Sequence, residues 1–224
     1  MSEGSAAALR APGARRTQAE RSAESRARIL DAAVACISEM GAAETTTQRI
    51  ARRAGLTWGA IQHHFGEKNA ILVTVVENGL DEIVVQLGEI SKVRGTLPER
   101  VHALISGLWP FYSGPLYRAG VEILLSARGD ASIRARAGEI RRRTIQEVGR
   151  AWSILFADVD VPRRRHVLAQ RVALAMLSGL ALEVSMRDEE ADFTSELAVL
   201  EGMVEKILLT ATNRSRRRGT RSRS

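Results

Sequence analysis

The chain has 224 residues, of which 45% are hydrophobic and 26% are charged. This length suits one large domain, or a small domain joined to a medium one, and the composition is typical of a soluble globular protein. No uninterrupted apolar run reaches the ~18 residues that a membrane span needs. The start, MSEGSAAALRAPGARR, lacks the apolar stretch of a secretory signal, and the single cysteine, Cys36, excludes an internal disulfide. We therefore expect a cytoplasmic protein without a membrane partner.

The net charge of +7 is concentrated at the two ends of the chain. Residues 1–70 carry ten Lys/Arg against seven Asp/Glu, and residues 71–213 carry seventeen against nineteen. The tail 214–224, RSRRRGTRSRS, carries six Arg and no acidic residue. This asymmetry favours a polyanionic partner at the ends of the chain. The tail can add non-specific DNA affinity, or it can be a solvated extension without a role.

The N-terminal third is expected to be helical after a disordered arm at residues 1–18, which is Ala/Gly/Arg-rich without periodicity. Apolar residues then recur at helical spacing up to Met40, where Gly41 can end the helix. Threonines at 45–47 and at 57 can cap two short helices, which Gly55 and Gly66 end. The expected helices are 19–40, 47–54, 57–64 and 67–90.

The rest of the chain also shows a helical pattern, and no segment alternates β-branched and polar residues as a strand would. Pro98 stands where a helix can begin, and the aromatic segment 109–115 is expected to break it. Further helices are expected at 116–127, 131–156, 162–186 and 192–210. The sequence thus predicts an all-α protein of about nine helices.

Two short helices separated by Gly55 form the pattern of a helix-turn-helix. Gly55 supplies a turn with positive φ, and Leu56 and Ile61 can fill the space between the two helices. In such a motif the second helix enters the major groove of DNA with its N-terminal residues at the base edges. Here that helix begins at Thr57. The pattern therefore predicts DNA binding.

The segments TTQRIARRAG (46–55) and TWGAIQHHFGEK (57–68) resemble the second helix, the recognition helix and the following turn of the TetR family of bacterial repressors. The resemblance is specific over residues 25–72. Beyond Leu72 it rests on length and on the all-helical pattern. Gln62 departs from the family, which usually has a phosphate-contacting Tyr there; Gln can bond adenine or reach a phosphate.

The DNA-contacting residues expected from the motif and from the resemblance lie in and next to the two short helices. They are Thr46, Thr47, Arg49, Thr57, Trp58, Gly59, Ala60, Gln62, His63, His64 and Lys68. Trp58 can touch a thymine methyl, or it can pack against the first helix. The resemblance implies that His64 donates to a phosphate; a purely structural hydrogen bond is the alternative. His63 and His64 are adjacent on a helix and cannot face one metal ion, so no metal site is expected.

The rest of the chain is expected to bind a small molecule and to dimerise, because members of the family that it resembles do both. An aromatic cluster with two polar neighbours suggests a pocket, although ordinary core packing around a proline explains it too. The expected pocket residues are His102, Trp109, Phe111, Tyr112, Tyr117 and Glu122. The resemblance implies that the last two helices pair with their copies, and burial within one subunit is the alternative. The expected interface residues are Val172, Met176, Leu177, Leu180, Leu200, Met203, Val204 and Ile207.

Three functions compete on these observations. The first is a transcriptional regulator that binds a palindromic operator as a homodimer and is released as a repressor by an unknown small-molecule effector. The second is a non-sequence-specific, Arg-tailed nucleoid-type protein. The third, an enzyme, is not expected, because no catalytic or phosphate-binding motif is present and no cofactor is implied. The expected division is an arm at 1–18, a DNA-binding domain at 19–66, a ligand-binding and dimerisation domain at 67–212, and a disordered tail at 213–224.

Overall fold

The computed structural model describes residues 17–126, 131–186 and 192–209. Within these residues the chain forms nine α-helices and no strand, which confirms the all-α prediction. The predicted arms at 1–18 and 213–224 lie almost wholly outside the described residues; of the first, only Thr17 and Gln18 are described, at the start of α1. The helices are α1 (Gln18–Glu44), α2 (Thr47–Ala54), α3 (Trp58–Phe65), α4 (Lys68–Ile90), α5 (Leu97–Ser113), α6 (Pro115–Ser126), α7 (Ala131–Leu155), α8 (Arg163–Met186) and α9 (Thr194–Leu209).

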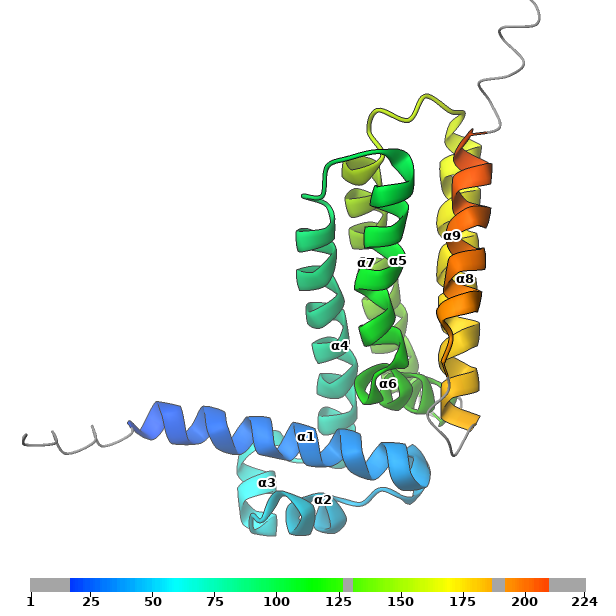
Figure 1. Cartoon of the computed structure of the whole chain (residues 1–224). Coiled ribbons are helices and arrows are strands. Elements are labelled where there is room, and N and C mark those ends of the chain that lie inside the picture. Colours follow the sequence, from blue (N-terminus) through cyan, green and yellow to red (C-terminus); the bar gives the residue numbers. More distant parts are fainter. Residues whose placement is uncertain (1–16, 127–130, 187–191, 210–224) are drawn as a thin grey trace, which may run out of the picture.

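The first three helices form a small head at one end of the molecule. Helix α1 lies across the base of the body, and α2 and α3 lie on its side that faces away from the body (Figure 1). The head has its own apolar core, in which Ile29, Ile37, Ile50 and Ile61 are fully buried. Ile71 at the start of α4 joins the same core. The head is therefore a packed unit, and α4 connects it directly to the body.

The body consists of α4 to α9, and its long helices run roughly side by side (Figure 1). Helices α8 and α9 form an antiparallel pair along one edge and pack against α5. At the far end, the buried Arg100 of α5 donates to the carboxylate of Asp158 (Nη2–Oδ2 3.0 Å) and to the carbonyl of Leu155 (2.6 Å). Its guanidinium also lies over the ring of Phe156. This cluster ties the start of α5 to the end of α7.

One expected helix end is confirmed and another is wrong. Gly41 leaves the helical conformation, with φ +79°, and so ends the regular helix as predicted; a short helical turn then follows up to Glu44. The expected break over 109–115 starts too early, because α5 passes through Pro110 and ends at Ser113, with Gly114 as its cap. Pro110 is exposed, and so is Ser106 one turn earlier, whose carbonyl loses its N–H partner. That carbonyl can bond to water, so the proline is tolerated there.

Helix α8 is long enough and apolar enough, by length and composition alone, to cross a membrane, although less than a quarter of its most apolar stretch is buried within the subunit. This differs from the expectation that no apolar segment reaches that length. The reason is that Arg171 interrupts the apolar run in the sequence without making the helix polar on average. The same helix packs against α5 and α9, so its exposed side is an apolar face that the subunit alone does not cover.

Candidate DNA-binding surface and ligand pockets

The helix-turn-helix has the geometry that its sequence predicts. Gly55 has φ +63°, in the left-handed region, and its N–H bonds back to the carbonyl of Arg52 at 3.2 Å. The hydroxyl of Thr46 caps α2 through the N–H of Arg49 (3.3 Å), and the hydroxyl of Thr57 caps α3 through the N–H of Ala60 (3.2 Å). Both hydroxyls already accept one bond, and both threonines are exposed. A phosphate near them would meet helix N-termini, which attract anions.

Helix α3 presents an exposed face that carries several of the predicted DNA-contacting residues. Trp58 at its first turn is 54% exposed, which argues against the alternative that it packs on α1. Gly59, Gln62 and His63 are exposed as well, whereas Ala60 is half-buried. A large aromatic ring that remains in water at the start of a helix is available to a partner. This surface faces away from the body (Figure 1).

The two histidines of α3 have different environments. Their rings meet edge to face, with 5.2 Å between centroids. His63 is exposed, while His64 is half-buried. Among the described residues, no group of three or more potential ligands could hold a metal ion. His63 thus belongs to the exposed surface of α3, and His64 lies at its edge.

Lys68 has a structural partner that the sequence did not reveal. Its Nζ donates to the carbonyl of Ala43 at 3.1 Å, in the last turn of α1. Burial lowers the pKa of Lys68, while the nearby Glu44 acts in the opposite direction. Lys68 therefore joins the start of α4 to the end of α1. To bind a phosphate, the Nζ of Lys68 would have to donate to it in addition to the Ala43 carbonyl, or in place of it.

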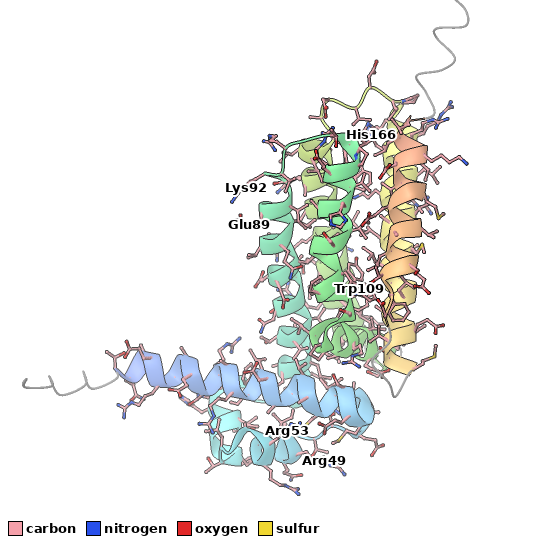
Figure 2. All side chains as sticks on the ribbon, in the orientation of Figure 1. Arg49, Arg53, Glu89, Lys92, Trp109 and His166 are labelled. Carbon is pink, nitrogen blue, oxygen red and sulfur yellow. The ribbon has the colours of Figure 1, made fainter. Side chains whose placement is uncertain are left out.

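The arginines of the head divide into exposed and structural groups. Arg49 is exposed on α2, with Nη1 3.0 Å from the sulfur of Met40. Arg53 pairs with Glu39 of α1 at 2.5 Å, so its side chain links α2 to α1. Figure 2 shows both side chains on the outer side of the head. Arg28 of α1 donates to the carbonyls of Ala54 and Gly55 at the end of α2, a role that the sequence did not predict. Long-range contacts of this kind leave no local pattern in the sequence.

An apolar pocket of about 230 Å³ lies in the body between α4, α5, α6 and α7. Among the predicted pocket residues, Phe111, Tyr112 and Tyr117 line it. Burial raises the pKa of the Tyr112 and Tyr117 phenols, with the Ser178 hydroxyl acting in the opposite direction. The remaining lining is almost entirely aliphatic, and it includes Gly79, Leu80, Gly120, Leu124, Ile140 and Ile145. Leu124 and Ile145 are exposed as well, so the pocket opens to the surface beside them.

Three predicted pocket residues do not line this pocket. His102 is exposed and pairs with Glu201 at 3.0 Å on α9. Trp109 points toward α9 and packs edge to face on Phe193, with 5.6 Å between centroids. The prediction grouped them with Tyr112 because they are close to it in the sequence. In a continuous helix, their direction follows the helical period instead. Glu122 lines a different, more polar pocket.

The outer side of α8 and α9 carries exposed apolar side chains. On α8, Leu168, Ala175, Gly179 and Leu182 recur at spacings of seven, four and three residues, and all are exposed. On α9, Val199 and Met203 are exposed in the same way. A surface groove between the two helices is lined by residues that include Leu168, Met203 and Ile207. Exposed apolar side chains thus recur along two adjacent helices on this face.

Part of the predicted dimer interface is wrong, because the side chains point inward. Leu177, Leu200 and Val204 are fully buried within the subunit and belong to the body's core. Met203 is exposed, and the remaining four predicted residues are half-buried, namely Val172, Met176, Leu180 and Ile207. Because α8 is apolar on two faces, its sequence could not say which face meets the core.

The compact head, its exposed recognition helix and the all-helical body define a helix-turn-helix DNA-binding regulator. Residues 29–75 match the family described as "Bacterial regulatory proteins, tetR family". The chain is 27% identical over 172 residues to the HTH-type transcriptional regulator BetI of Serratia proteamaculans, covering 72% of this chain and 81% of that one. It is 24% identical over 182 residues to the fatty acid metabolism regulator protein of Bacillus subtilis, covering 81% and 92%.

Solved structures have the same fold. The transcriptional regulator FadR from Bacillus subtilis, in complex with stearoyl-CoA, matches with a TM-score of 0.63 and 19% identity, covering 82% of this chain and 97% of that one. The TetR-family regulator PfmR from Thermus thermophilus matches with a TM-score of 0.59 and 21% identity, covering 87% and 97%. Residues 29–75 are thus a tetR-family domain, and the chain is similar over most of its length to bacterial transcriptional regulators.

Proposed function

We propose that this protein is a repressor that binds a palindromic operator as a homodimer and leaves it when a small molecule enters the body. The observation that carries the proposal is the course of α4. This helix starts in the core of the head at Ile71 and lines the apolar pocket at Gly79, Leu80 and Ile83. A ligand that displaces α4 in the pocket thus displaces the head as well. A ligand shifts the equilibrium only through its different affinities for the two states.

The DNA contacts are proposed from exposure and local geometry. Trp58, Gln62 and His63 lie where the recognition helix would meet base edges. Thr46, Thr47 and Arg49 lie at the start of α2, where the helix dipole and a cation favour phosphates. The domain division follows: residues 19–66 form the DNA-binding domain, and residues 67–212 form the ligand-binding and dimerisation domain.

The homodimer is proposed from the exposed apolar face of α8 and α9. A two-fold axis beside these helices would bury Leu168, Leu182, Val199 and Met203 against their copies, and small Ala175 and Gly179 permit close approach. A dimer also supplies the two recognition helices that a palindrome requires. The relatives are bacterial regulators, so we place the protein in the cytoplasm and assign the apolar side of α8 to a second subunit.

The effector is proposed to be compact. An engineered apolar cavity of ~150 Å³ holds benzene, so a pocket of about 230 Å³ suits an apolar group of roughly nine heavy atoms. The FadR structure from Bacillus subtilis contains stearoyl-CoA. A chain of that length would need the pocket of this protein to open further.

The test is selection of bound sequences from a random duplex pool at ~150 mM salt, which suppresses the non-specific contribution. We expect a palindromic consensus with half-sites a whole number of helical turns apart. Absence of any enrichment would favour the nucleoid-type alternative, in which the Arg-rich ends dominate binding.

A further inference from the structure

A second pocket, of about 410 Å³, lies where α1, α6 and α8 meet, between the head and the body. We call it the junction pocket. Its volume falls in the ~300–1,000 Å³ range of small-molecule sites. It differs from the apolar pocket in chemistry: Ser38 comes from α1, Arg118 and Glu122 from α6, and Ser178 and Ser185 from α8. The two pockets share only the side chains of Tyr117 and Val121.

Arg118 lines this pocket, and its Nε is buried beneath neighbouring atoms without an acceptor among the described residues. A ligand therefore meets the guanidinium from the pocket side, and it reaches the Nε only if the side chain turns. Buried donors in native proteins are normally satisfied. A ligand that supplies a planar pair of acceptor oxygens, as a carboxylate does, matches the guanidinium fork.

The neighbours of Arg118 define the rest of the ligand. Glu122 lies one turn further along α6 and is exposed. None of the ion pairs of the described residues joins it to Arg118. The Ser38 hydroxyl can donate to an anion, because its bond to the Pro115 carbonyl is long at 3.5 Å, whereas Ser185 would first have to leave the Ala181 carbonyl at 3.0 Å. Leu125 and Leu182 give the pocket an apolar side. These features favour an organic anion over an inorganic one.

We propose that the junction pocket is a second small-molecule site, and that it binds a small organic acid through its carboxylate at Arg118. The apolar part of the acid packs against Leu125 and Leu182. Such a ligand touches the head through Ser38, whose hydroxyl otherwise makes only a long bond of 3.5 Å to the Pro115 carbonyl. It also touches α8. Binding itself does not depend on the proposed repressor function, whereas any effect of the ligand on DNA affinity rests on it.

The test is calorimetric titration of the full-length protein, without DNA, with sodium hexanoate and with its uncharged match, hexanamide. We expect hexanoate to bind at millimolar or lower concentration and hexanamide to bind roughly tenfold or more weakly, because a charge-assisted bond is lost. Arg118→Met should weaken hexanoate by a similar factor. Its thermal midpoint should stay near that of the wild type, because the Nε of Arg118 has no partner to lose.

Two further variants separate the junction pocket from the apolar pocket. Glu122→Gln should tighten hexanoate binding, because it removes a negative charge from the same pocket. Gly120→Leu should leave hexanoate binding unchanged, because Gly120 lines the apolar pocket and has open space for a side chain. If Gly120→Leu abolishes hexanoate binding while Arg118→Met and Glu122→Gln leave it unchanged, the acid lies in the apolar pocket and the proposal is wrong.

The same titrations distinguish this proposal from the proposed function. Wild-type protein that does not bind hexanoate, or binds hexanamide equally well, overturns the junction site whatever the DNA results are. If the protein binds hexanoate through Arg118 but enriches no DNA sequence, the proposed junction site stands and the proposed repressor function is wrong.

Discussion

Two glycines show how the same residue type has opposite effects on stability. Gly55 has φ +63°, and a Cβ there would lie 3.0 Å from Nη2 of Arg28, the atom that caps α2. Gly88 lies exposed inside α4, where a Cβ would meet nothing within 4 Å. We expect Gly55→Ala to destabilise the protein by about 1–2 kcal/mol and Gly88→Ala to stabilise it by about 0.5–1 kcal/mol. Urea unfolding at one fixed protein concentration measures both; equal signs would contradict the argument.

At the recognition helix, single residues should separate sequence reading from general DNA affinity. Trp58→Ala and Gln62→Ala should lower the affinity for the selected operator more than the affinity for random DNA. The reason is that these exposed side chains face the base edges in the proposed complex. Lys68→Ala should weaken binding to both DNAs alike. It should also reduce the slope of log affinity against log salt concentration by about 0.9, the contribution of one phosphate. Fluorescence anisotropy on both duplexes across a salt series gives the comparison. Equal losses for Trp58→Ala on both duplexes would remove it from the base-reading surface.

Lys68→Ala also tests a role that is independent of DNA. The side chain donates to the Ala43 carbonyl, so the variant should melt at a lower temperature than the wild type. Lys68→Arg, which keeps a charged donor, should recover most of the loss. If DNA affinity falls while the melting temperature does not, Lys68 acts mainly on phosphate.

At the scale of the element, helix caps determine how the body responds to acid. Glu99 at the start of α5 accepts hydrogen bonds from the N–H and the hydroxyl of Thr96 (2.8 and 2.9 Å), and these bonds lower its pKa. Arg100, the next residue of α5, donates hydrogen bonds to Asp158 beyond the end of α7, and these bonds lower the pKa of Asp158. A carboxyl with a lowered folded-state pKa stabilises the fold above its unfolded pKa of about 4. That stability is lost as the pH falls through the folded pKa.

The free energy of unfolding should therefore fall as the pH drops below about 4.5. Glu99→Gln and Asp158→Asn should be less stable than the wild type at pH 7, and the difference should shrink toward zero in acid. Asp81→Asn, at an exposed position on α4, controls for the loss of one negative charge. A constant difference between Glu99→Gln and the wild type at every pH would show that the carboxylate charge plays no part.

At the scale of the whole molecule, the apolar side of α8 and α9 is the proposed surface of assembly. Leu168→Glu and Val199→Glu place a charge on exposed positions of that face, so both should turn a dimer into soluble, folded monomers. Val85→Glu is the matched control, because Val85 is 68% exposed on α4 and lies outside that face. Sedimentation equilibrium at micromolar concentration gives the mass. Dimers in all three variants would mean that the subunits meet elsewhere, and a wild type that binds lipid vesicles would assign the face to a membrane.

The contrast between Leu168 and Leu177 also shows why assembly needed the structure. Both are leucines of α8, and both follow a helical spacing from other apolar residues. One is half exposed and the other is fully buried. A charge at Leu177 would enter the core and unfold the subunit, so it would report on folding and not on dimerisation.

The sequence by itself determined the features that depend on neighbouring residues. The threonine caps, the turn at Gly55 and the all-helical class all follow from local backbone chemistry. The tertiary structure alone decided which face of α8 is buried, that Lys68 and Arg28 bond to backbone carbonyls 25 or more residues away, and that Tyr112 lines a pocket whereas His102 does not. The physical reason is that helical periodicity shows which residues share a face, whereas only packing against other elements shows what that face meets.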